Sequence, residues 1–517
     1  MLRSPISGGR LCTVAFSLLF FPAAANAATF VRGDVDSSGE LDITDPIKAL
    51  GYLFLGTPDS LLCIDAADAN DSGELDLSDP IHLLTHLFLG GSTPAEPFPG
   101  CGEDLTEDSL GCAEYPPCES GVQVLKGNIE RDEFPEVSPE DLAELALGNT
   151  AFALDLYRAV EGDHENLLVS PYSISVALAM TYAGARGDTE AQMASALHFT
   201  LPQERLHPAF NALDLALESR SEAPPEEEGD RFQLNVANAI WGEKTWPFLT
   251  SFLDVLSENY GAGLRILDFM KAPEWCRTTI NTWVRDETQG RIQDLLPPDS
   301  ITEDTRLVLT NALYFKASWF HPFDEEATRP GAFTLRDGRE ITVPTMRTTG
   351  PFRIAKEDGY EAAELMYLGE QLSMVILMPD AARFDEFEAQ LDPAVLASIL
   401  ASLQGGWVDL SMPKFGCRTS LSLRETLMAL GMTDAFGPMA NFSGIDGLGL
   451  LYISKVLHKT FIGVDETGTE AAAATAVIMP PIGLPPEIHV NRPFLYLIRD
   501  IPTGTILFLG RVLDPRS

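Results

Sequence analysis

The chain has 517 residues, of which 45% are hydrophobic, and a formal net charge of −41. This length allows several domains and a large core. The acidic balance disfavours nucleic acid as a partner and gives no general heparin-seeking surface, because polyanions are bound by basic patches.

The first 27 residues are typical of a secretory signal peptide. Arg3 and Arg10 precede an apolar run, Leu11–Phe21, and Ala25-Asn26-Ala27 supplies small residues for cleavage. A membrane anchor is the competing interpretation, but the run is too short to span the ~30 Å of hydrocarbon in a bilayer. We therefore expect residues 1–27 to be removed and the protein to be secreted, with no membrane span.

Residues 28–92 contain the same twelve-residue pattern twice, 34 residues apart. Side chains with oxygen recur at loop positions one, three, five, nine and twelve, and a glycine, Gly39 or Gly73, stands at position six. Calcium takes six to eight oxygen ligands, and glycine supplies the sharp bend that such loops need. With position seven included, the predicted calcium ligands are Asp34, Asp36, Ser38, Glu40, Asp42 and Asp45 in the first loop and Asp68, Asn70, Ser72, Glu74, Asp76 and Asp79 in the second. An acidic surface with coincidental spacing is disfavoured because the pattern occurs twice in one frame.

Each loop is followed by one predicted helix. Asp45-Pro46 and Asp79-Pro80 are typical of an N-cap followed by proline at the first helical position. Such duplicated loop-plus-helix units resemble dockerins, small all-α, EF-hand-like modules. The resemblance implies a cohesin-like scaffold as a candidate partner, recognised through Ile43-Thr44 and Leu77-Ser78. Position twelve of each loop is Asp instead of the usual EF-hand Glu, and serine, Ser38 or Ser72, replaces the carboxylate that is usual at position five.

Residues 93–138 are rich in glycine, proline and acidic residues, which predicts an acidic linker. Three cysteines lie inside it, so disulfides can constrain this segment instead of leaving it free. Together with Cys63, the residues Cys101, Cys112 and Cys118 can form two disulfides, in a pairing that the sequence leaves open. Cys276 and Cys417 are predicted to be buried thiols.

Near the C-terminus, the sequence of residues 468–479 predicts a loop that can become a β-strand. Small, mostly uncharged residues alternate there, so that one face of an extended chain carries no charge. That face comprises Thr469, Ala471, Ala473, Thr475, Val477 and Met479. The segment would span roughly 40 Å as a strand, yet it runs into a proline-rich stretch that no sheet interior would accept. A low-complexity alanine linker is the competing interpretation.

The flanking residues favour the loop. The stretch from Glu466 to Ala474 and the Pro485-Pro486-Glu487 block resemble the hinge and the post-cleavage segment of the serpin family. Upstream, Leu307 to Trp319 resembles a central strand, and Asn441 to Ile445 resembles the Phe-Ser-Gly-Ile turn of the family. The resemblance covers residues 139–517 and implies an α+β serpin fold with three β-sheets, eight or nine helices and an exposed reactive loop.

The resemblance also implies a mechanism. A serine protease cleaves the Ile482–Gly483 bond and forms an acyl-enzyme, and the freed loop inserts into the central sheet before hydrolysis. The implied hinge residues are Glu466, Gly468, Thr469, Glu470, Ala471, Ala472, Ala473 and Ala474. The residues implied where the sheet opens are Ser170, Ser173, Asn311, Trp319 and His458.

Apolar Ile482 favours a protease with elastase-like or subtilisin-like specificity over a trypsin-like one. The basic helix through which some serpins bind heparin is not evident in residues 201–230. No Gly-x-Ser-x-Gly, His-Glu-x-x-His or phosphate-binding glycine loop occurs, so we do not expect an enzyme. A non-inhibitory serpin carried as cargo of a calcium-dependent docking protein is the alternative function.

Overall fold

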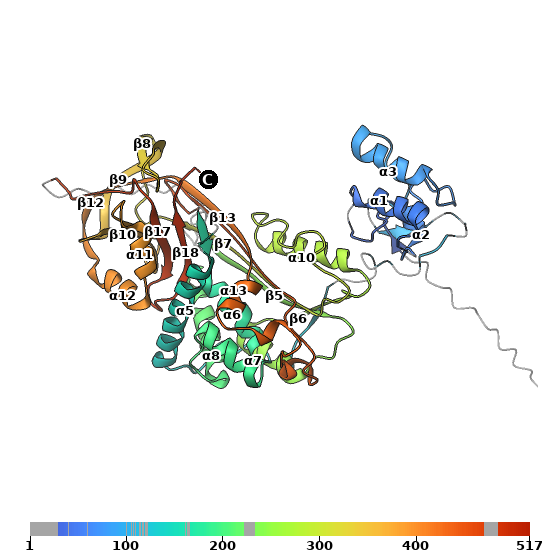
Figure 1. Ribbon diagram of the computed structural model, residues 1–517, viewed down its shortest axis with the longest axis horizontal. Helices are drawn as coiled ribbons and strands as arrows, with labels where there is room; N and C mark the ends of the chain where they lie inside the picture. Colours follow the sequence, from blue (N-terminus) through green and yellow to red (C-terminus); the bar gives the residue numbers. More distant parts are fainter. Residues whose placement is uncertain are drawn as a thin grey trace, which may run out of the picture. The chain divides into compact units, whose positions relative to one another are not determined.

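The computed structural model describes residues 29–516 with several internal gaps (Figure 1). The gaps are residues 40, 59, 100, 105, 107, 109, 113–114, 116–117, 119–121, 161, 163–165, 222–232 and 470–483. The chain divides into two compact units, the first made of residues up to Glu119 except Ser37–Gly39, and the second made mainly of residues from Ser120 onward. Each unit is described by itself.

The N-terminal unit is mainly helical. Its elements are β1 (Thr29–Phe30), α1 (Thr44–Leu50), the π-helix η1 (Gly51–Leu55), α2 (Ile64–Ala67), α3 (Ser78–Leu89) and β2 (Gly102–Glu103). The predicted all-α module therefore also contains a short antiparallel ribbon, in which β1 pairs with β2. Ala49 of α1 and Leu83 of α3 are fully buried in a small core with Val35 and Ala69.

The predicted linker is divided between the two units. Its first part folds back on the repeats, because a disulfide joins Cys63 to Cys112 and Ala95 N–H donates to Ala69 O at 3.1 Å. A second disulfide, between Cys101 and Cys118, closes a loop within the segment. Its last part contains β3 (Gln123–Leu125), which pairs with a strand of the second unit. These long-range contacts are the physical reason why this segment is not a free linker.

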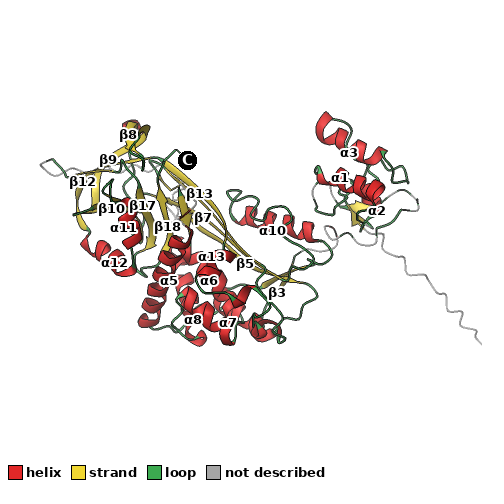
Figure 2. Ribbon diagram, in the orientation of Figure 1, coloured by secondary structure: helices red, strands yellow, loops and turns green. Residues whose placement is uncertain are grey.

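The described residues of the second unit form ten α-helices and two large sheets. Figure 2 colours the helices red and the strands yellow. The α-helices of this unit are α5 (Pro139–Val160), α6 (Pro171–Tyr182), α7 (Gly187–Leu197), α8 (Gln203–Glu218), α9 (Thr250–Tyr260), α10 (Pro273–Glu287), α11 (Phe384–Gln390), α12 (Pro393–Ser402), α13 (Arg424–Ala429) and α14 (Ser443–Asp446). The 3₁₀ turns are η3 (Ser219–Ser221), η4 (Glu325–Ala327) and η5 (Asp434–Phe436). This number of helices exceeds the eight or nine predicted.

The larger sheet has nine strands in the order β16-β12-β9-β10-β11-β17-β18-β4, with β8 also paired to β9. The strands are β4 (Leu167–Val169), β8 (Arg329–Thr334), β9 (Glu340–Glu357), β10 (Tyr360–Met366), β11 (Leu372–Pro379), β12 (Gln404–Pro413), β16 (Glu487–His489), β17 (Phe494–Asp500) and β18 (Ile506–Val512). Three sheets were predicted for this unit, whereas its described strands form two. The reason is β9, whose 18 residues pair with β8 and β12 along one part and with β10 near its end, so that one ladder joins both groups.

The second sheet has seven strands in the order β13-β14-β15-β7-β5-β6-β3. The strands are β5 (Gln233–Glu243), β6 (Leu264–Leu267), β7 (Leu307–Ser318), β13 (Phe415–Ser422), β14 (Lys455–Val464), β15 (Gly468–Thr469) and β3. Strand β14 also pairs directly with β7, in parallel, from Lys455 opposite Val308 to Phe461 opposite Tyr314.

Helices cover both faces of this sheet (Figure 1). Leu309 and Leu313 of β7 pack in the main core with residues of α6, whereas Val308 and Ala312 pack in a second core with residues of α10. Strand β7 is buried on both faces, and eight of its twelve residues are apolar. Successive residues of β7 therefore point alternately into the main core and into the second core.

Candidate functional site

The chain turns back on itself where β14 ends, and this turn starts the predicted hinge. Asp465 N–H donates to Gly468 O at 3.0 Å, and Asp465 Oδ1 accepts from the N–H of Thr467 at 2.9 Å. Gly468 is required here because a Cβ at this position would lie 2.2 Å from Ala317 O on β7. The tight turn directs the next residue between two strands.

That next residue, Thr469, is fully buried. It lies opposite Val464 of β14 on one side and opposite Ala317 of β7 on the other, both antiparallel. Its Oγ1 is 2.8 Å from the hydroxyl of Tyr367, whose ring stacks on Trp319 with centroids 4.6 Å apart. The beginning of the predicted loop is thus already a strand of the sheet.

Trp319 and Glu466 hold the turn. Trp319 Nε1 donates to Asp465 O at 3.0 Å. The carboxylate of Glu466 accepts from Lys414 Nζ at 2.6 Å and from Thr328 Oγ1 at 2.7 Å. Burial by itself would raise the pKa of Glu466, but these hydrogen bonds outweigh it and lower the pKa.

Below the turn, a row of polar side chains crosses three strands of the sheet. Asn311 of β7 lies opposite His458 of β14 and opposite Asn238 of β5. Asn311 Nδ2 donates to Asn238 Oδ1 at 2.6 Å and to Ser173 Oγ of α6 at 2.5 Å. The predicted residues Ser173, Asn311 and His458 are therefore brought together where β14 and β7 pair directly.

The protonation of His458 follows from its partners. The backbone N–H of Ser170 donates to Nε2 at 3.1 Å, so the neutral ring carries its proton on Nδ1, which donates to Asn311 Oδ1. Burial lowers the pKa of His458 to about 3. Ser170 also caps α6, since its Oγ accepts from Ser173 N–H at 3.3 Å.

Several predicted residues fall outside the described part of the chain. These are Glu470, Ala471, Ala472, Ala473, Ala474, Ile482 and Gly483. The chain is described again from Leu484, which is fully exposed, and β16 then pairs in parallel with β12.

Four side chains that bind the hinge or the polar row were not predicted: Asn238, Thr328, Tyr367 and Lys414. Asn238 interrupts a run of apolar residues in β5, from Val236 to Trp241, and a polar residue within such a run was the signal that could have identified it. Thr328, Tyr367 and Lys414 carry no such local signal, because each meets the hinge only through the tertiary fold.

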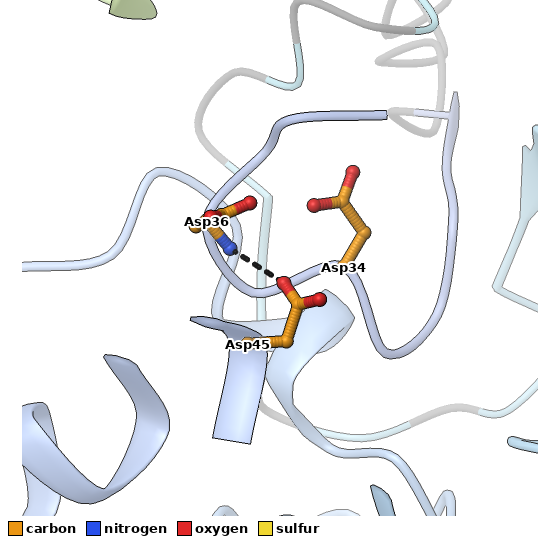
Figure 3. Close-up of side chains that lie close together, drawn as sticks. All are labelled: Asp34, Asp36 and Asp45. Carbon is orange, nitrogen blue, oxygen red and sulfur yellow. Dashed lines mark hydrogen bonds between the residues drawn. The ribbon is translucent and has the colours of Figure 1, made fainter. Parts of the chain in front are cut away.

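In the first acidic loop, Asp34, Asp36 and Asp45 converge with carboxylate oxygens within 4.8 Å of one another (Figure 3). Asp45 Oδ1 accepts from the N–H of Val35 at 2.8 Å and of Asp36 at 3.2 Å. Burial, and then the charges of Asp36 and Asp34, raise the pKa of Asp45 to about 9. A divalent cation with oxygen ligands would relieve this repulsion.

The second loop is closed by its last aspartate in the same way as the first. Asp79 Oδ2 accepts from Asp76 N–H at 2.9 Å, as Asp45 Oδ2 accepts from Asp42 N–H at 2.8 Å. Gly73 and Gly39 both have positive φ, 79° and 87°. The sequence repeat is thus a repeat of backbone structure.

Other predicted ligands are engaged within the loops. Asp42 accepts from Thr44 and Asp76 from Ser78, in both cases through backbone N–H and hydroxyl. Asn70 Nδ2 donates to Ser78 Oγ, Ser72 Oγ donates to Glu74 O, and Asp68 accepts from the N–H of Ser72 and Gly73. Glu40 lies outside the described residues.

The predicted N-caps are wrong by position. Helices α1 and α3 begin at Thr44 and Ser78, one residue before Asp45 and Asp79. Both aspartates turn toward the loop because its backbone N–H groups offer them hydrogen bonds there. They are therefore loop-closing residues that also sit in the first turn of a helix.

Cys276 and Cys417 are buried free thiols, as predicted. Among the described residues, none of the helices combines the length and apolar character needed to cross a bilayer.

Comparison with known proteins gives the family. The family model for serpin (serine protease inhibitor) matches residues 147–515. Leukocyte elastase inhibitor from Sus scrofa is 39% identical over 387 residues, which is 72% of this chain and all of that protein. Antithrombin-III from Mus musculus is 36% identical over 406 residues, 76% of this chain and 87% of that protein.

The structural comparison agrees. The thermophilic serpin tengpin in its native state superposes with a TM-score of 0.65 and 30% identity, over 76% of this chain and all of that chain. The order of strands around β15 and the family match both lie in the second unit. The chain belongs to the serpin family of serine protease inhibitors.

Proposed function

We propose that this protein inhibits a serine protease as a suicide substrate, cleaved at Ile482–Gly483 and followed by insertion of residues 469–482 between β14 and β7. The observation that carries the proposal is Thr469, which already lies between these two strands. Insertion needs only the extension of this short strand, at the expense of the direct β14–β7 pairing below it.

The register of Thr469 supports a defined path. Continued by one residue, it puts Glu470 opposite Lys316, so the one charge of the segment would meet a basic partner on the same face. Continued by six residues, it puts Thr475 opposite Asn311 and His458. The incoming strand would then separate the two side chains that bind one another in the uncleaved protein.

The face that would enter the main core is free of charge. Thr469 lies on the face of Ala317 and Leu313, which belong to that core, so Ala471, Ala473 and Thr475 would follow it. An unpaired charge at any of these positions would cost several kcal/mol on burial. The hinge therefore suits rapid insertion.

An apolar reactive residue and the similarity to a leukocyte elastase inhibitor favour a target with elastase-like specificity, with subtilisin-like proteases as the neighbouring class. With the signal peptide at residues 1–27, we propose that inhibition takes place outside the cell.

Incubation with elastase-, subtilisin- and trypsin-type proteases tests this proposal. We expect an SDS-resistant adduct with an apolar-specific protease and release of a peptide that begins at Gly483, identified by mass spectrometry. Thr469→Arg should convert the adduct into cleaved product. Quantitative cleavage without an adduct across the panel would instead favour a non-inhibitory serpin.

We further propose that the N-terminal unit is a dockerin-like module that binds calcium in both loops. Asp34, Asp36 and Asp45 would hold the first ion. By their equivalent positions in the sequence repeat, Asp68, Asp76 and Asp79 would hold the second, together with oxygens of Asn70 and the loop backbone. The ion would supply the positive charge that lets buried carboxylates stay ionised.

The same unit has a surface suited to docking. Large apolar side chains are exposed at equivalent positions of the two repeats, each pair 34 residues apart: Ile43 and Leu77, Ile47 and Ile81, Phe54 and Phe88, and Leu55 and Leu89. Exposed apolar residues in such a pattern favour a protein partner, for which we propose a cohesin-like scaffold. Binding of an immobilised cohesin panel in calcium, its loss in chelator and its loss in Phe54→Ser/Phe88→Ser would support this assignment.

A further inference from the structure

A third group of carboxylates lies in the N-terminal unit, outside the predicted ligands of the two loops. Asp65 belongs to α2, and Asp104 and Asp108 belong to the segment that the two disulfides hold. The three residues offer carboxylate oxygens within 4.8 Å of one another. Asp108 also lies this close to Asp68 and Asp71.

One basic side chain, that of Arg32, contacts this group of carboxylates. The guanidinium of Arg32 is fully buried, and its Nη2 lies 2.9 Å from oxygens of both Asp71 and Asp104. Its Nη1 donates to the backbone oxygens of Asp65 and Asp68. Arg32 thus compensates Asp71 and Asp104 and leaves most of the negative charge of the group without a counter-charge.

Asp65 is the member that Arg32 does not satisfy. Its side chain is only 9% exposed, and Oδ1 lies 3.8 Å from Arg32 Nη1, beyond hydrogen-bond distance. Among the described residues nothing donates a hydrogen bond to this buried oxygen. A buried carboxylate oxygen that faces two other carboxylates is costly unless a proton or a cation lies between them.

We propose that Asp65, Asp104 and Asp108 form an additional divalent-cation site. Three carboxylates without nitrogen or sulfur ligands fit a hard ion such as calcium, with water completing its coordination. The ion would fasten the disulfide-held segment to α2, because its ligands come from both. The site uses none of the residues predicted as ligands of the two loops, and it is separate from the inhibitory loop.

Calcium binding to the full-length mature protein tests the site by equilibrium dialysis. Asp108→Ala is the main variant, since Asp108 is exposed and its Oδ1 accepts only from Leu110 N–H at 2.7 Å among the described residues. Asp132→Ala is a matched control, because Asp132 is also exposed and also accepts from the N–H two residues on, at 3.0 Å. Asp65→Asn removes the buried charge while keeping the shape of the side chain.

We expect Asp108→Ala and Asp65→Asn each to bind one calcium ion fewer per chain than the parent, and Asp132→Ala to bind as many as the parent. Equal binding by the parent and both site variants would overturn the proposal and leave a shared proton between the carboxylates. A loss in Asp108→Ala alone would also overturn it, since Asp68 and Asp71 would then hold the ion without Asp65. If the two loops do not bind calcium, the parent binds fewer ions in total. The difference of one ion between the parent and these variants is then unchanged, so the two outcomes can be told apart.

Discussion

Replacing Thr469 by arginine tests whether insertion beside Thr469 is the basis of inhibition. Thr469 is fully buried, and its hydroxyl is the hydrogen-bond partner of the buried Tyr367 hydroxyl. Loss of that partner costs about 1–3 kcal/mol, and burial of an unpaired guanidinium costs several kcal/mol more. The variant should therefore keep this segment out of the sheet while the rest of the unit folds.

In Thr469→Arg, we expect more of the acyl-enzyme to be hydrolysed and less of it to be trapped by loop insertion. If the barrier to insertion rises by ~3 kcal/mol, insertion slows about 100-fold, and hydrolysis releases the protease before it is trapped. The stoichiometry of inhibition should rise steeply, and cleaved inhibitor should accumulate. Thr469→Ser keeps the hydroxyl and should behave as the parent, whereas Thr469→Val isolates the loss of the Tyr367 contact. An unchanged stoichiometry in Thr469→Arg would refute insertion as the mechanism.

Three further predictions concern other parts of the molecule. Lys414→Met leaves the carboxylate of Glu466 without its cation; the turn should be held less firmly by about 1–2 kcal/mol, and inhibitory activity should decay faster on incubation at raised temperature. Burial lowers the pKa of His458 to about 3, so between pH ~3 and ~6.5 the unfolded state binds a proton that the folded state excludes. Stability should fall as the pH decreases through this range, and His458→Gln should flatten the slope by up to ~1.4 kcal/mol per pH unit in denaturant unfolding. Finally, chelation of calcium should make residues 29–119 sensitive to proteolysis and leave the second unit resistant; equal sensitivity with and without calcium, or an unaltered response in Asp34→Asn/Asp68→Asn, would contradict calcium-coupled folding.

The fold class and the place of the hinge could be predicted because they depend on local patterns. Gly468 and Thr469 stand in a motif whose residues are constrained by neighbours in sequence and by the close approach of β7. Ser173, Asn311 and His458 were predicted from resemblance to a family, and the structure brings their side chains together. Asn238, which completes the same row, belongs to no quoted motif and was missed.

Long-range contacts account for the rest. Glycine, proline and acidic residues predict local flexibility in residues 93–138, but Arg32 pairs with Asp104, 72 positions away, and this pairing leaves no local trace. The pairing of the disulfides could not be predicted for the same reason, since four cysteines allow three pairings and their spacing does not distinguish between them. Asp45 and Asp79 were assigned as helix caps because an Asp-Pro pair favours that role, whereas the preceding loop competes for the same carboxylate oxygens.

The register at Thr469 leads to a last prediction, which concerns Thr475. If insertion continues that register, Thr475 comes between Asn311 and His458 and separates Nδ1 of His458 from Asn311 Oδ1, its acceptor in the uncleaved protein. Its hydroxyl can then accept from Nδ1 and donate to Asn311, so that neither buried group is left without a partner.

Thr475→Val keeps the shape of the side chain and removes this hydroxyl. The cleaved, inserted form should lose about 1–3 kcal/mol of stability, measured as a lower unfolding midpoint in denaturant. The uncleaved form should be unaffected, since His458 and Asn311 still bind one another there. Thr475→Ser should restore the midpoint of the cleaved form, and a cleaved Thr475→Val protein as stable as the parent would show that the inserted strand does not follow the register set by Thr469.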